Sequence, residues 1–400
     1  MRQTLTFEQA PPIPSFLIQD VLAKLAYLDE RVTGATIASD GSSVTLLLTD
    51  ASGADLRATL GERLSSVVQA MAEGAFEPEF RVLEEHVFDM VGSADPTPEL
   101  VARFELVEEG PGIFALGPLL TRLIEYFEQR LMQVANRMGA APYRFPALIS
   151  PAYMEQVQYF RNFPHSLSFA THLRENLPAI QKFSCDAVTK EGRIEVDPEV
   201  YAAMPAMLAP TVCHHLYMSL RDRRLGSGGV VATASGSCFR FESRNMVSLE
   251  RLWNFTMREV IFVGTDEQVR AGLDEVRGQI RAILADFNLS HKLMTANDPF
   301  FIGTFRDQAA YQAAYELKYE IRAWLPYKND TLAIGSYNRH GDFFGRRLNI
   351  RLEDGSPAHT GCIGIGFERL AHTFVSQHGL DPAQWPRTVR EAVGSLPQDR

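Results

Sequence analysis

Two neighbouring segments of the sequence carry charged and aromatic side chains at spacings that put them on one face of a strand. Side chains on an extended strand alternate between its two faces, so residues two or four apart point the same way. Charged groups that face inward without a partner are costly, and such a face therefore needs an occupant. The residues that share a face are Cys238, Arg240 and Glu242 in CFRFE, and Arg251, Phe255 and Glu259 in RLWNFTMRE.

A nucleoside triphosphate is an occupant that matches these residue types. The guanidinium groups of Arg240 and Arg251 suit phosphate oxygens, and the ring of Phe255 can stack on a base. A carboxylate on the same face can accept from the amino group of a base. An exposed antiparallel hairpin with cross-strand ion pairs explains the pattern equally well when these residues are taken alone.

A glycine-rich segment near the C-terminus adds a third piece. GCIGIGFERLAHTF has glycines at 361, 364 and 366 on a predicted strand, and a helix follows that begins near Glu368-Arg369. Glycines allow a backbone or a flat ring to approach closely. The Gly-Lys-Ser/Thr of a phosphate-binding loop is absent, so this segment alone is also compatible with an ordinary strand-to-helix turn.

Two long helices and two strand-rich regions must position these residues. The first helix ends at Gly139, and residues 139–148 follow as a strand that ends on a proline. The second helix lies between the strand-rich regions 230–262 and 331–369. The apolar residues at helical spacing are Leu119, Leu120, Leu123, Ile124, Phe127, Leu131 and Val134 in the first helix, and Val269, Leu273, Val276, Ile280, Ile283 and Phe287 in the second.

The Gly110-Pro111-Gly112 turn divides off an N-terminal segment with the pattern of a small α+β module. Residues 1–110 carry 7 Lys and Arg against 19 Asp and Glu, a net charge of −12, while the rest of the chain is at +2. So acidic a module repels phosphate backbones, which argues against a role in binding RNA. Its predicted elements are helices over Phe16–Tyr27 and Ala58–Ala72, and strands over Arg31–Ile37, Ser43–Leu48 and Glu79–Val87.

The composition is that of a folded cytoplasmic enzyme. Of the 400 residues, 46% are hydrophobic and 22% charged, enough for two or three domains. The first residues lack a basic segment followed by an apolar run, and no stretch approaches the roughly 18 apolar residues of a membrane span. Neither secretion nor membrane insertion is expected. Four scattered cysteines predict metal binding or burial rather than a disulfide framework.

Taken together, three segments resemble the signature motifs of class II aminoacyl-tRNA synthetases, in their order and local spacing. Residues 119–148 are similar to motif 1, a long helix, a glycine and a strand ending in proline. Residues 239–259 match motif 2, FRxE, a loop and RxxxFxxxE, and residues 364–369 match the alternating glycines and Glu-Arg of motif 3. The resemblance implies an α+β fold: an antiparallel sheet flanked by helices in residues 113–400, with a helical insert near 264–312. Residues 1–112 form the extra acidic module.

The resemblance also implies a homodimer built through motif 1 and activation of a carboxylic acid by ATP and Mg²⁺. By motif position, Arg240 grips the α-phosphate, Glu242 the adenine amino group and Phe255 one face of the adenine. Arg369 holds the γ-phosphate, and Arg251 assists. The usual magnesium-binding glutamate is missing from the strand before Asn338, which leaves Asp330 and Glu353 as unranked ligand candidates.

Two cysteines and a glutamate predict a zinc site beside the nucleotide. Thiolates and a carboxylate suit Zn²⁺, and an open coordination position can read an α-amino group. Taken without a resemblance to any family, these residues favour buried structural cysteines. The resemblance to atypical archaeal seryl-tRNA synthetases and their bacterial relatives, the amino acid:[carrier protein] ligases, implies a Cys–Glu–Cys set at these places. The ligands are Cys213, Glu259 and Cys362; possible substitutes are His214 and His215, and, less favoured, Cys185 and Cys238.

The acceptor of the activated acyl group is the remaining question. The segment NRHGDFFGRRLNI, residues 338–350, is similar to the carrier-protein ligases and also to the seryl enzymes. A seryl-tRNA synthetase needs a basic tRNA-gripping domain, and the spare domain here is acidic, so tRNA is disfavoured as a partner. The sequence therefore predicts a ligase that loads a small amino acid onto the phosphopantetheine thiol of an acyl or peptidyl carrier protein. A seryl-type synthetase and a non-catalytic paralogue that binds an amino acid or a partner stay open as alternatives.

Two further groups of residues each have two interpretations. Arg270, Arg277 and Arg281 lie along one stripe of the second long helix, where an acidic carrier protein would dock. Pairing of these arginines with Asp274 and other acidic neighbours on the helix is an equal alternative. The identity of the amino acid stays open; Phe160, Asn162 and His165 line either its pocket or an ordinary core.

Overall fold

The structure is a computed structural model that describes residues 3–50, 55–72, 81–242, 246, 248–296 and 317–393. Within these ranges, no helix is long and apolar enough to cross a bilayer. The part of the predicted insert that covers residues 297–312 lies outside the described residues.

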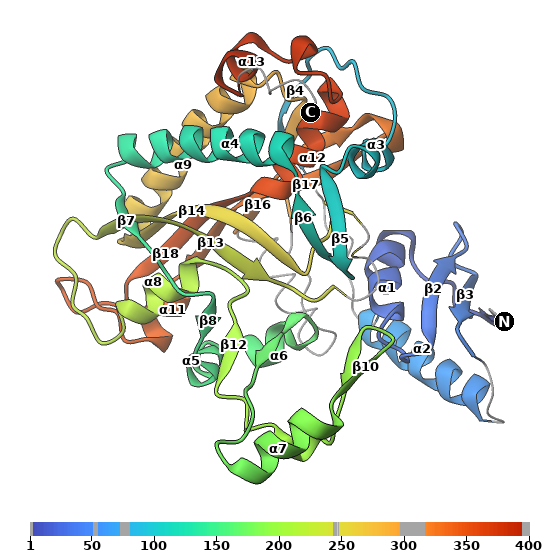
Figure 1. The fold of residues 1–400 in the computed structure, drawn as a ribbon. Coiled ribbons are helices and arrows are strands. Elements are labelled where there is room, and N and C mark those ends of the chain that lie inside the picture. Colours follow the sequence, from blue (N-terminus) through green and yellow to red (C-terminus); the bar gives the residue numbers. More distant parts are fainter. Residues whose placement is uncertain are drawn as a thin grey trace.

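An eight-stranded mixed sheet forms the centre of the molecule (Figure 1). Its strand order is β4-β15-β16-β17-β18-β14-β13-β7, and every pairing is antiparallel except β13 with β7. The predicted α+β class with an antiparallel-rich sheet flanked by helices is confirmed. The strands are β4 (Val82–His86), β7 (Ala141–Tyr143), β13 (Val230–Phe239), β14 (Asn254–Gly264), β15 (His291–Thr295), β16 (Lys318–Leu325), β17 (Asp330–Gly341) and β18 (His359–Gly366).

The helices α4 (Pro118–Arg137), α9 (Asp266–Asp286) and α12 (Phe367–His378) contribute to the largest core together with one face of this sheet. Val260 and Phe262 of β14 point into that core, whereas Ile261 and Val263 point into a second core on the opposite face. This alternation follows from the two-residue period of a strand, and it explains why β14 is apolar on both faces. Figure 1 shows α4 and α9 running across the sheet.

The second core holds the short elements that close the other face of the sheet. It includes α8 and α11 and a small three-stranded sheet of order β8-β12-β9. Helices α5 and α6 lie between β8 and β9 in the chain, and α7 and the β10–β11 hairpin lie between β9 and β12. These elements are β8 (Leu148–Ile149), α5 (Pro151–Gln156), α6 (Tyr159–Asn162), β9 (Phe169–Ala170), α7 (Leu177–Asp186), β10 (Val188–Lys190), β11 (Arg193–Glu195), β12 (Ala206–Leu208), α8 (Cys213–Ser219) and α11 (Phe343–Arg347).

Local sequence signals set the ends of the two long helices. Pro118 occupies the first turn of α4, where a missing N–H is tolerated, and Gly139 after its end has a φ of 66°, which glycine adopts at no steric cost. Thr265 and Gln268 form a capping box at the start of α9, each satisfying a backbone N–H of the other.

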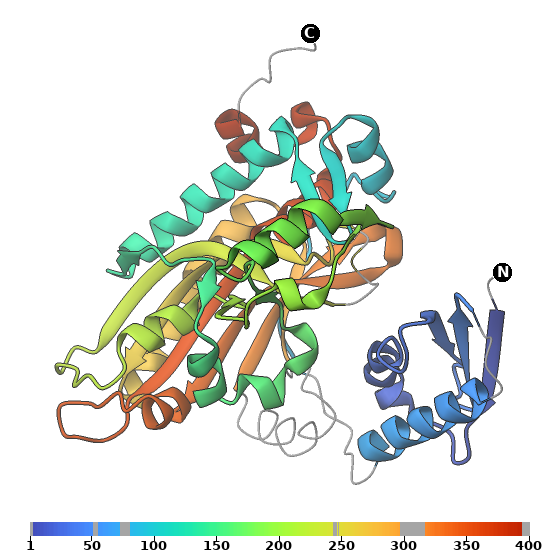
Figure 2. The ribbon, with the colours of Figure 1, turned by 60° about the horizontal axis from the view of Figure 1, so that its bottom comes forward.

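The N-terminal residues form a small sheet of order β1-β3-β2 with its own core, set to one side of the large sheet (Figure 2). Helices and strands predicted there are present, but one strand was assigned to the wrong sheet. The strand predicted over Glu79–Val87 is β4, which pairs with β15 at the edge of the large sheet. The elements are β1 (Gln3–Glu8), α1 (Ile18–Leu25), β2 (Val32–Ile37), β3 (Ser43–Leu48) and α2 (Leu56–Ala72), followed by α3 (Thr97–Ala102), β5 (Leu106–Gly110) and β6 (Ile113–Leu116); α13 (Arg387–Val393) comes last.

Candidate functional site

A pocket opens over the sheet where β13, β14, β16, β17 and β18 meet the start of α12. Four residues predicted to bind the nucleotide line it: Arg240, Glu242, Phe255 and Arg369. They come from three distant segments that antiparallel pairing brings together, since β14 pairs with β13 on one side and with β18 on the other. The remaining lining residues are Leu249, Leu252, Met257, Lys318, Glu320, Ala333, Ile334, Gly335, Ser336, Gly364, Gly366 and Glu368.

The side chains predicted to bind the phosphates and the adenine are oriented by contacts with one another and with the backbone. The Arg240 guanidinium lies 5.4 Å from the centre of the Phe255 ring, and its Nε donates to the Pro210 carbonyl at 3.0 Å. Arg251 is not part of the pocket lining, but its Nη1 donates to Glu242 at 2.9 Å. Arg251 therefore positions the carboxylate assigned to the adenine amino group.

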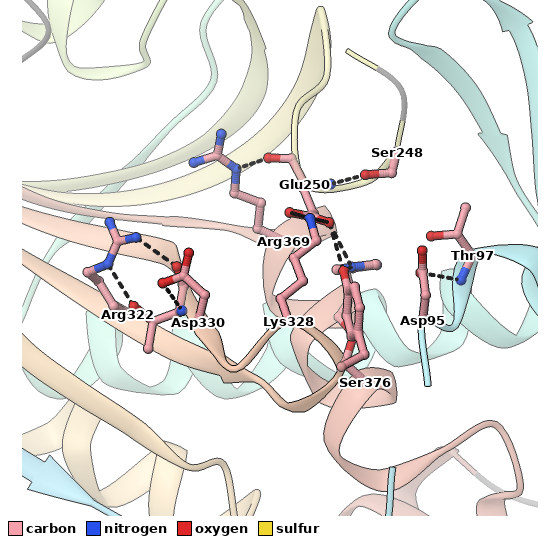
Figure 3. A network of polar contacts seen from close by, with 12 residues as sticks. Asp95, Thr97, Ser248, Glu250, Arg322, Lys328, Asp330, Arg369 and Ser376 are labelled. Carbon is pink, nitrogen blue, oxygen red and sulfur yellow. Dashed lines mark hydrogen bonds and ion pairs between the residues drawn. The ribbon is translucent and has the colours of Figure 1, made fainter. Parts of the chain in front are cut away.

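Motif 3 is fixed to motif 2 by Glu368 and Arg369, two residues in the first turn of α12. Both carboxylate oxygens of Glu368 accept from the Thr256 amide of β14, at 2.8 and 2.9 Å. Arg369 donates through Nε to the carbonyl of Glu250 at 2.6 Å (Figure 3). Its Nη1 donates to the carbonyl of Ala333 at 3.2 Å. Desolvation lowers the pKa of Arg369, but an arginine keeps its charge, so this guanidinium is a half-buried cation that lines the pocket.

The three predicted zinc ligands lie together. The ligand atoms of Cys213, Glu259 and Cys362 are all within 4.8 Å of one another, and all three residues are buried. Cys213 opens α8, Glu259 lies on β14, and Cys362 lies on β18. Gly364 of the nucleotide pocket pairs directly with Glu259, so the cluster and the pocket share the β14–β18 pair.

The cluster fits a cation better than it fits an empty core. Glu259 accepts from the Thr211 hydroxyl at 2.5 Å and from the Val212 amide at 3.2 Å, both through Oε1. Its Oε2 is buried and has no hydrogen-bond partner among the described residues. A buried carboxylate oxygen without a partner is costly, and two thiols and this oxygen are donors that Zn²⁺ prefers. Asn338 adds a contact from outside the set, because its amide donates to Cys362 Sγ at 3.9 Å.

The protonation states of the cluster follow from this crowding. Burial, with the nearby negative charge of Cys362, raises the pKa of Glu259 to about 7. A hydrogen bond donated by the Cys213 thiol lowers the pKa of Cys362 to about 5. The same hydrogen bond, with burial and the Glu259 charge, raises the pKa of Cys213 well above its usual value. The two thiols therefore share one proton near neutral pH.

The substitute ligands lie outside this cluster. His214 shares a hydrogen bond with the Tyr153 hydroxyl at 3.2 Å, and burial lowers its pKa to about 3. His215 stacks on Phe145 with ring centres 5.3 Å apart. The remaining cysteines are Cys185, which is exposed, and Cys238, which is buried.

The predicted docking arginines each have an acidic partner. Arg270 pairs with Asp266 at 2.7 Å on the same helix. Arg277 lies 3.8 Å from Asp274, as the alternative reading expected, and Arg281 lies 3.2 Å from Glu84. Glu84 belongs to β4 and also lies 3.7 Å from Arg277, a partner that the sequence did not indicate because β4 was assigned to the small module.

The residues considered for the amino acid pocket and for Mg²⁺ do not lie together in the structure. Phe160 packs against the second core, as an ordinary core residue does. His165 makes an edge-to-face contact with Tyr27 of the N-terminal module, with ring centres 5.6 Å apart. Asp330 and Glu353 are absent from the described pocket lining, whereas Glu320 is present.

Glu320 and Lys318 are pocket residues that the sequence analysis did not single out. Lys318 pairs with Asn338 and Glu320 with Ser336 in the β16–β17 register. Both therefore flank the strand that lacks the expected glutamate. Only the register reveals this, because β16 precedes β17 and carries no motif of its own.

Comparisons with known proteins agree with this geometry. Residues 205–378 match the family model described as tRNA synthetase class II core domain (G, H, P, S and T). The fold resembles that of M. kandleri SerRS, solved in complex with A. aeolicus tRNASec, with a TM-score of 0.71 at 20% identity over 100% of this chain and 80% of that one. The fold is thus that of a class II synthetase core, a class whose members use ATP and Mg²⁺.

Relatives define the family more closely. Amino acid--[acyl-carrier-protein] ligase 2 of Bradyrhizobium diazoefficiens is 30% identical over 77% of this chain and 90% of its own length. Ligase 1 of the same organism is 29% identical over 76% of this chain and 91% of its own length. The type-2 serine--tRNA ligase of Methanopyrus kandleri is 24% identical, over 72% of this chain and 58% of its own length. The chain belongs to the class II synthetase-like amino acid:[carrier protein] ligases, which are related to archaeal type-2 seryl-tRNA synthetases, and it is a ligase.

Proposed function

We propose that this protein activates a small amino acid with ATP as an aminoacyl-adenylate and transfers it to the phosphopantetheine thiol of a carrier protein. One observation supports this most directly: the Cys213–Glu259–Cys362 cluster adjoins the nucleotide pocket across the β14–β18 pair. An amino acid that bridges the two would present its amine to the cluster and its carboxylate to the α-phosphate. The printed names of the two Bradyrhizobium relatives support the carrier protein as acceptor.

In the first step, a carboxylate oxygen of the amino acid attacks the α-phosphorus, and pyrophosphate leaves with the electron pair of the broken P–O bond. Arg240 stabilises the charge on the α-phosphate, and Arg369 holds the γ-phosphate in line. Phe255 and Glu242 fix the adenine from its face and from its amino group. In the second step, the pantetheine thiol gives up its proton and its sulfur attacks the acyl carbon, so that AMP leaves and a thioester remains.

Cys213, Glu259 and Cys362 would hold Zn²⁺, which when bound supplies an electrophilic position for the α-amino group. Glu320 lines the pocket beside β17, the strand that lacks the magnesium-binding glutamate, and it accepts from Arg322 at 2.8 Å.

Three further features belong to the same proposal. The motif 1 helix α4 and the exposed edge strand β7 supply a homodimer contact, because β7 is the outermost strand of the sheet. The stripe of Arg270, Arg277 and Arg281 is the carrier docking face. The thiolate-based metal site suits the reducing cytoplasm. The chain is divided into the acidic N-terminal module and the catalytic domain, with β4 contributed to the latter sheet.

The test is an amino-acid-dependent ATP–pyrophosphate exchange assay over a panel of amino acids, followed by mass spectrometry of acceptors. Pantetheinylated carrier proteins and bulk tRNA are offered side by side to the active amino acid. The proposal expects exchange with one or a few small amino acids and a thioester on a carrier. Acylated tRNA would instead favour the seryl-type synthetase, to which the whole chain is similar in fold. Zinc binding without any exchange would favour the non-catalytic paralogue.

A further inference from the structure

A half-buried carboxylate outside the pocket connects the motif 2 loop, the β16–β17 turn and α12. Glu250 lies at the end of the motif 2 loop, between the pocket residues Leu249 and Leu252 and next to Arg251. Its carboxylate receives two bonds from Lys328 Nζ, at 2.6 and 2.7 Å, and one from the Tyr327 hydroxyl at 2.7 Å. Lys328 and Tyr327 belong to the short 3-10 turn that connects β16 to β17.

The same cluster reaches the motif 3 helix. The Tyr327 hydroxyl lies 3.1 Å from Nε2 of His372, which is fully buried on α12. Glu250 is thus connected to the motif 2 loop through its own backbone, to the β16–β17 turn through Lys328, and to α12 through Tyr327. The motif 2 loop and α12 contribute lining residues to the nucleotide pocket, and so do β16 and β17, the two strands that the turn connects.

The backbone of Glu250 carries the connection to the chemistry. Its carbonyl accepts from Arg369 Nε at 2.6 Å, while its amide donates to the Ser248 hydroxyl at 3.3 Å (Figure 3). The Arg251 amide donates to the Ser248 carbonyl at 3.1 Å, which closes the turn. A carboxylate held by three bonds fixes where its own carbonyl lies, and the carbonyl in turn orients the Arg369 guanidinium.

Charge and burial agree with a fixed geometry. Burial raises the pKa of Glu250, but the bonds from Lys328 and Tyr327 and the charge of Lys328 outweigh it, so the pKa lies below its usual value. Burial lowers the pKa of His372 to about 4, so this ring is neutral at pH 7 and adds no competing charge. Glu250 is therefore ionised throughout the neutral range and accepts the bonds from Lys328 and Tyr327 as a carboxylate.

We propose that Glu250 is a positioning residue for ATP: anchored by Lys328 and Tyr327, it holds the motif 2 loop so that its carbonyl aims Arg369 at the γ-phosphate. This inference rests on the proposed function, because it takes the γ-phosphate as the ligand of Arg369. It concerns the nucleotide half of the site and leaves the amino acid half unaffected.

The experiment measures pyrophosphate exchange by the full-length, zinc-loaded enzyme while ATP and the amino acid are varied separately. Removing a charge-assisted anchor in Glu250→Ala should raise the KM for ATP about tenfold and change the KM for the amino acid less than about twofold. Glu250→Gln keeps an acceptor for Tyr327 and Lys328 and should recover part of this loss. The exposed Glu391→Ala on α13 is the matched carboxylate control and should behave as wild type.

A second variant tests the inference even if Glu250→Ala fails to fold. Lys328 is 46% exposed, so Lys328→Met removes the anchor without opening the core, and it should raise the KM for ATP in the same direction. The double variant should be no worse than Glu250→Ala, because both act through one contact. An unchanged KM for ATP in Lys328→Met and Glu250→Gln, or an equal rise for ATP and amino acid, overturns the inference.

Calorimetric titration with ATP and Mg²⁺ distinguishes a failure of the proposed function from a failure of the role proposed for Glu250. A wild-type protein that binds ATP but shows no exchange would remove the proposed function and still allow Glu250 to be tested by affinity. A wild-type protein that exchanges, with variants that bind ATP equally well, would remove the role of Glu250 alone.

Discussion

Zinc binding to the metal-free protein should release between about one and two protons at pH 7, and this number follows from the crowding of the three ligands. The ligand atoms of Cys213, Glu259 and Cys362 lie within 4.8 Å of one another in a buried cluster. The two thiols share one proton, because the pKa of Cys362 is lowered to about 5 while that of Cys213 is raised. That proton must leave when both sulfurs bind the metal.

Glu259 contributes the remaining fraction. Its pKa is raised to about 7, so roughly half of the molecules carry a proton there at pH 7. The total is about 1.5 protons, and the zinc association constant should therefore rise about 30-fold from pH 6.5 to 7.5. The sign is set by competition: protons occupy the same atoms as the metal, so acid weakens binding.

The assay is isothermal calorimetry of Zn²⁺ binding at pH 7 in buffers with different heats of ionisation. The dependence of the observed heat on the buffer heat gives the number of protons directly. Cys185→Ser, at an exposed cysteine, is the control and should release the same number. Cys362→Ser should lose tight binding. Proton release near zero, or tight zinc binding retained by Cys362→Ser, would refute the assignment of these ligands.

Three further outcomes are expected. Arg369→Ala should abolish pyrophosphate exchange and leave the protein folded, as circular dichroism would check; an active variant would remove Arg369 from the nucleotide site. Glu128→Ala should destabilise the fold by about 2–3 kcal/mol, because Arg258, whose side chain is only 8% exposed, would lose a bond of 2.8 Å and remain charged; urea unfolding with a loss under about 0.5 kcal/mol would contradict this. The pKa of His372 is lowered to about 4, below its unfolded value, so its contribution to stability is complete above about pH 6.5 and is lost as the pH falls towards 4. From pH 7.5 to 5.5 the free energy of unfolding of the wild type should thus fall by about 1.4 kcal/mol more than that of His372→Gln. Equal falls for the two proteins in urea titrations would contradict this role of His372.

The predictions that succeeded depend on local patterns. The helix α4 follows from leucines at helical spacing between Pro118 and Gly139, and β13 and β14 follow from alternating segments. The order of the three motifs was sufficient to predict one pocket, because the class II sheet pairs the strands that carry motifs 2 and 3 side by side.

The features that were missed depend on long-range pairing. The strand β4 has the pattern of any half-exposed strand, and only its pairing with β15 places Glu84 beside Arg277 and Arg281. Glu320 enters the pocket through its register with Ser336, and register is not written in a single strand. Glu250 looks like an ordinary loop carboxylate until the β16–β17 turn folds against it.

A crystal structure with a non-hydrolysable aminoacyl-adenylate analogue and Zn²⁺ tests the central claim most directly. The adenine should stack on Phe255, the phosphate-like group should contact Arg240, and the amine should bind zinc held by Cys213, Glu259 and Cys362. Density for the analogue elsewhere, or an amine that points away from the two cysteines, would contradict the account.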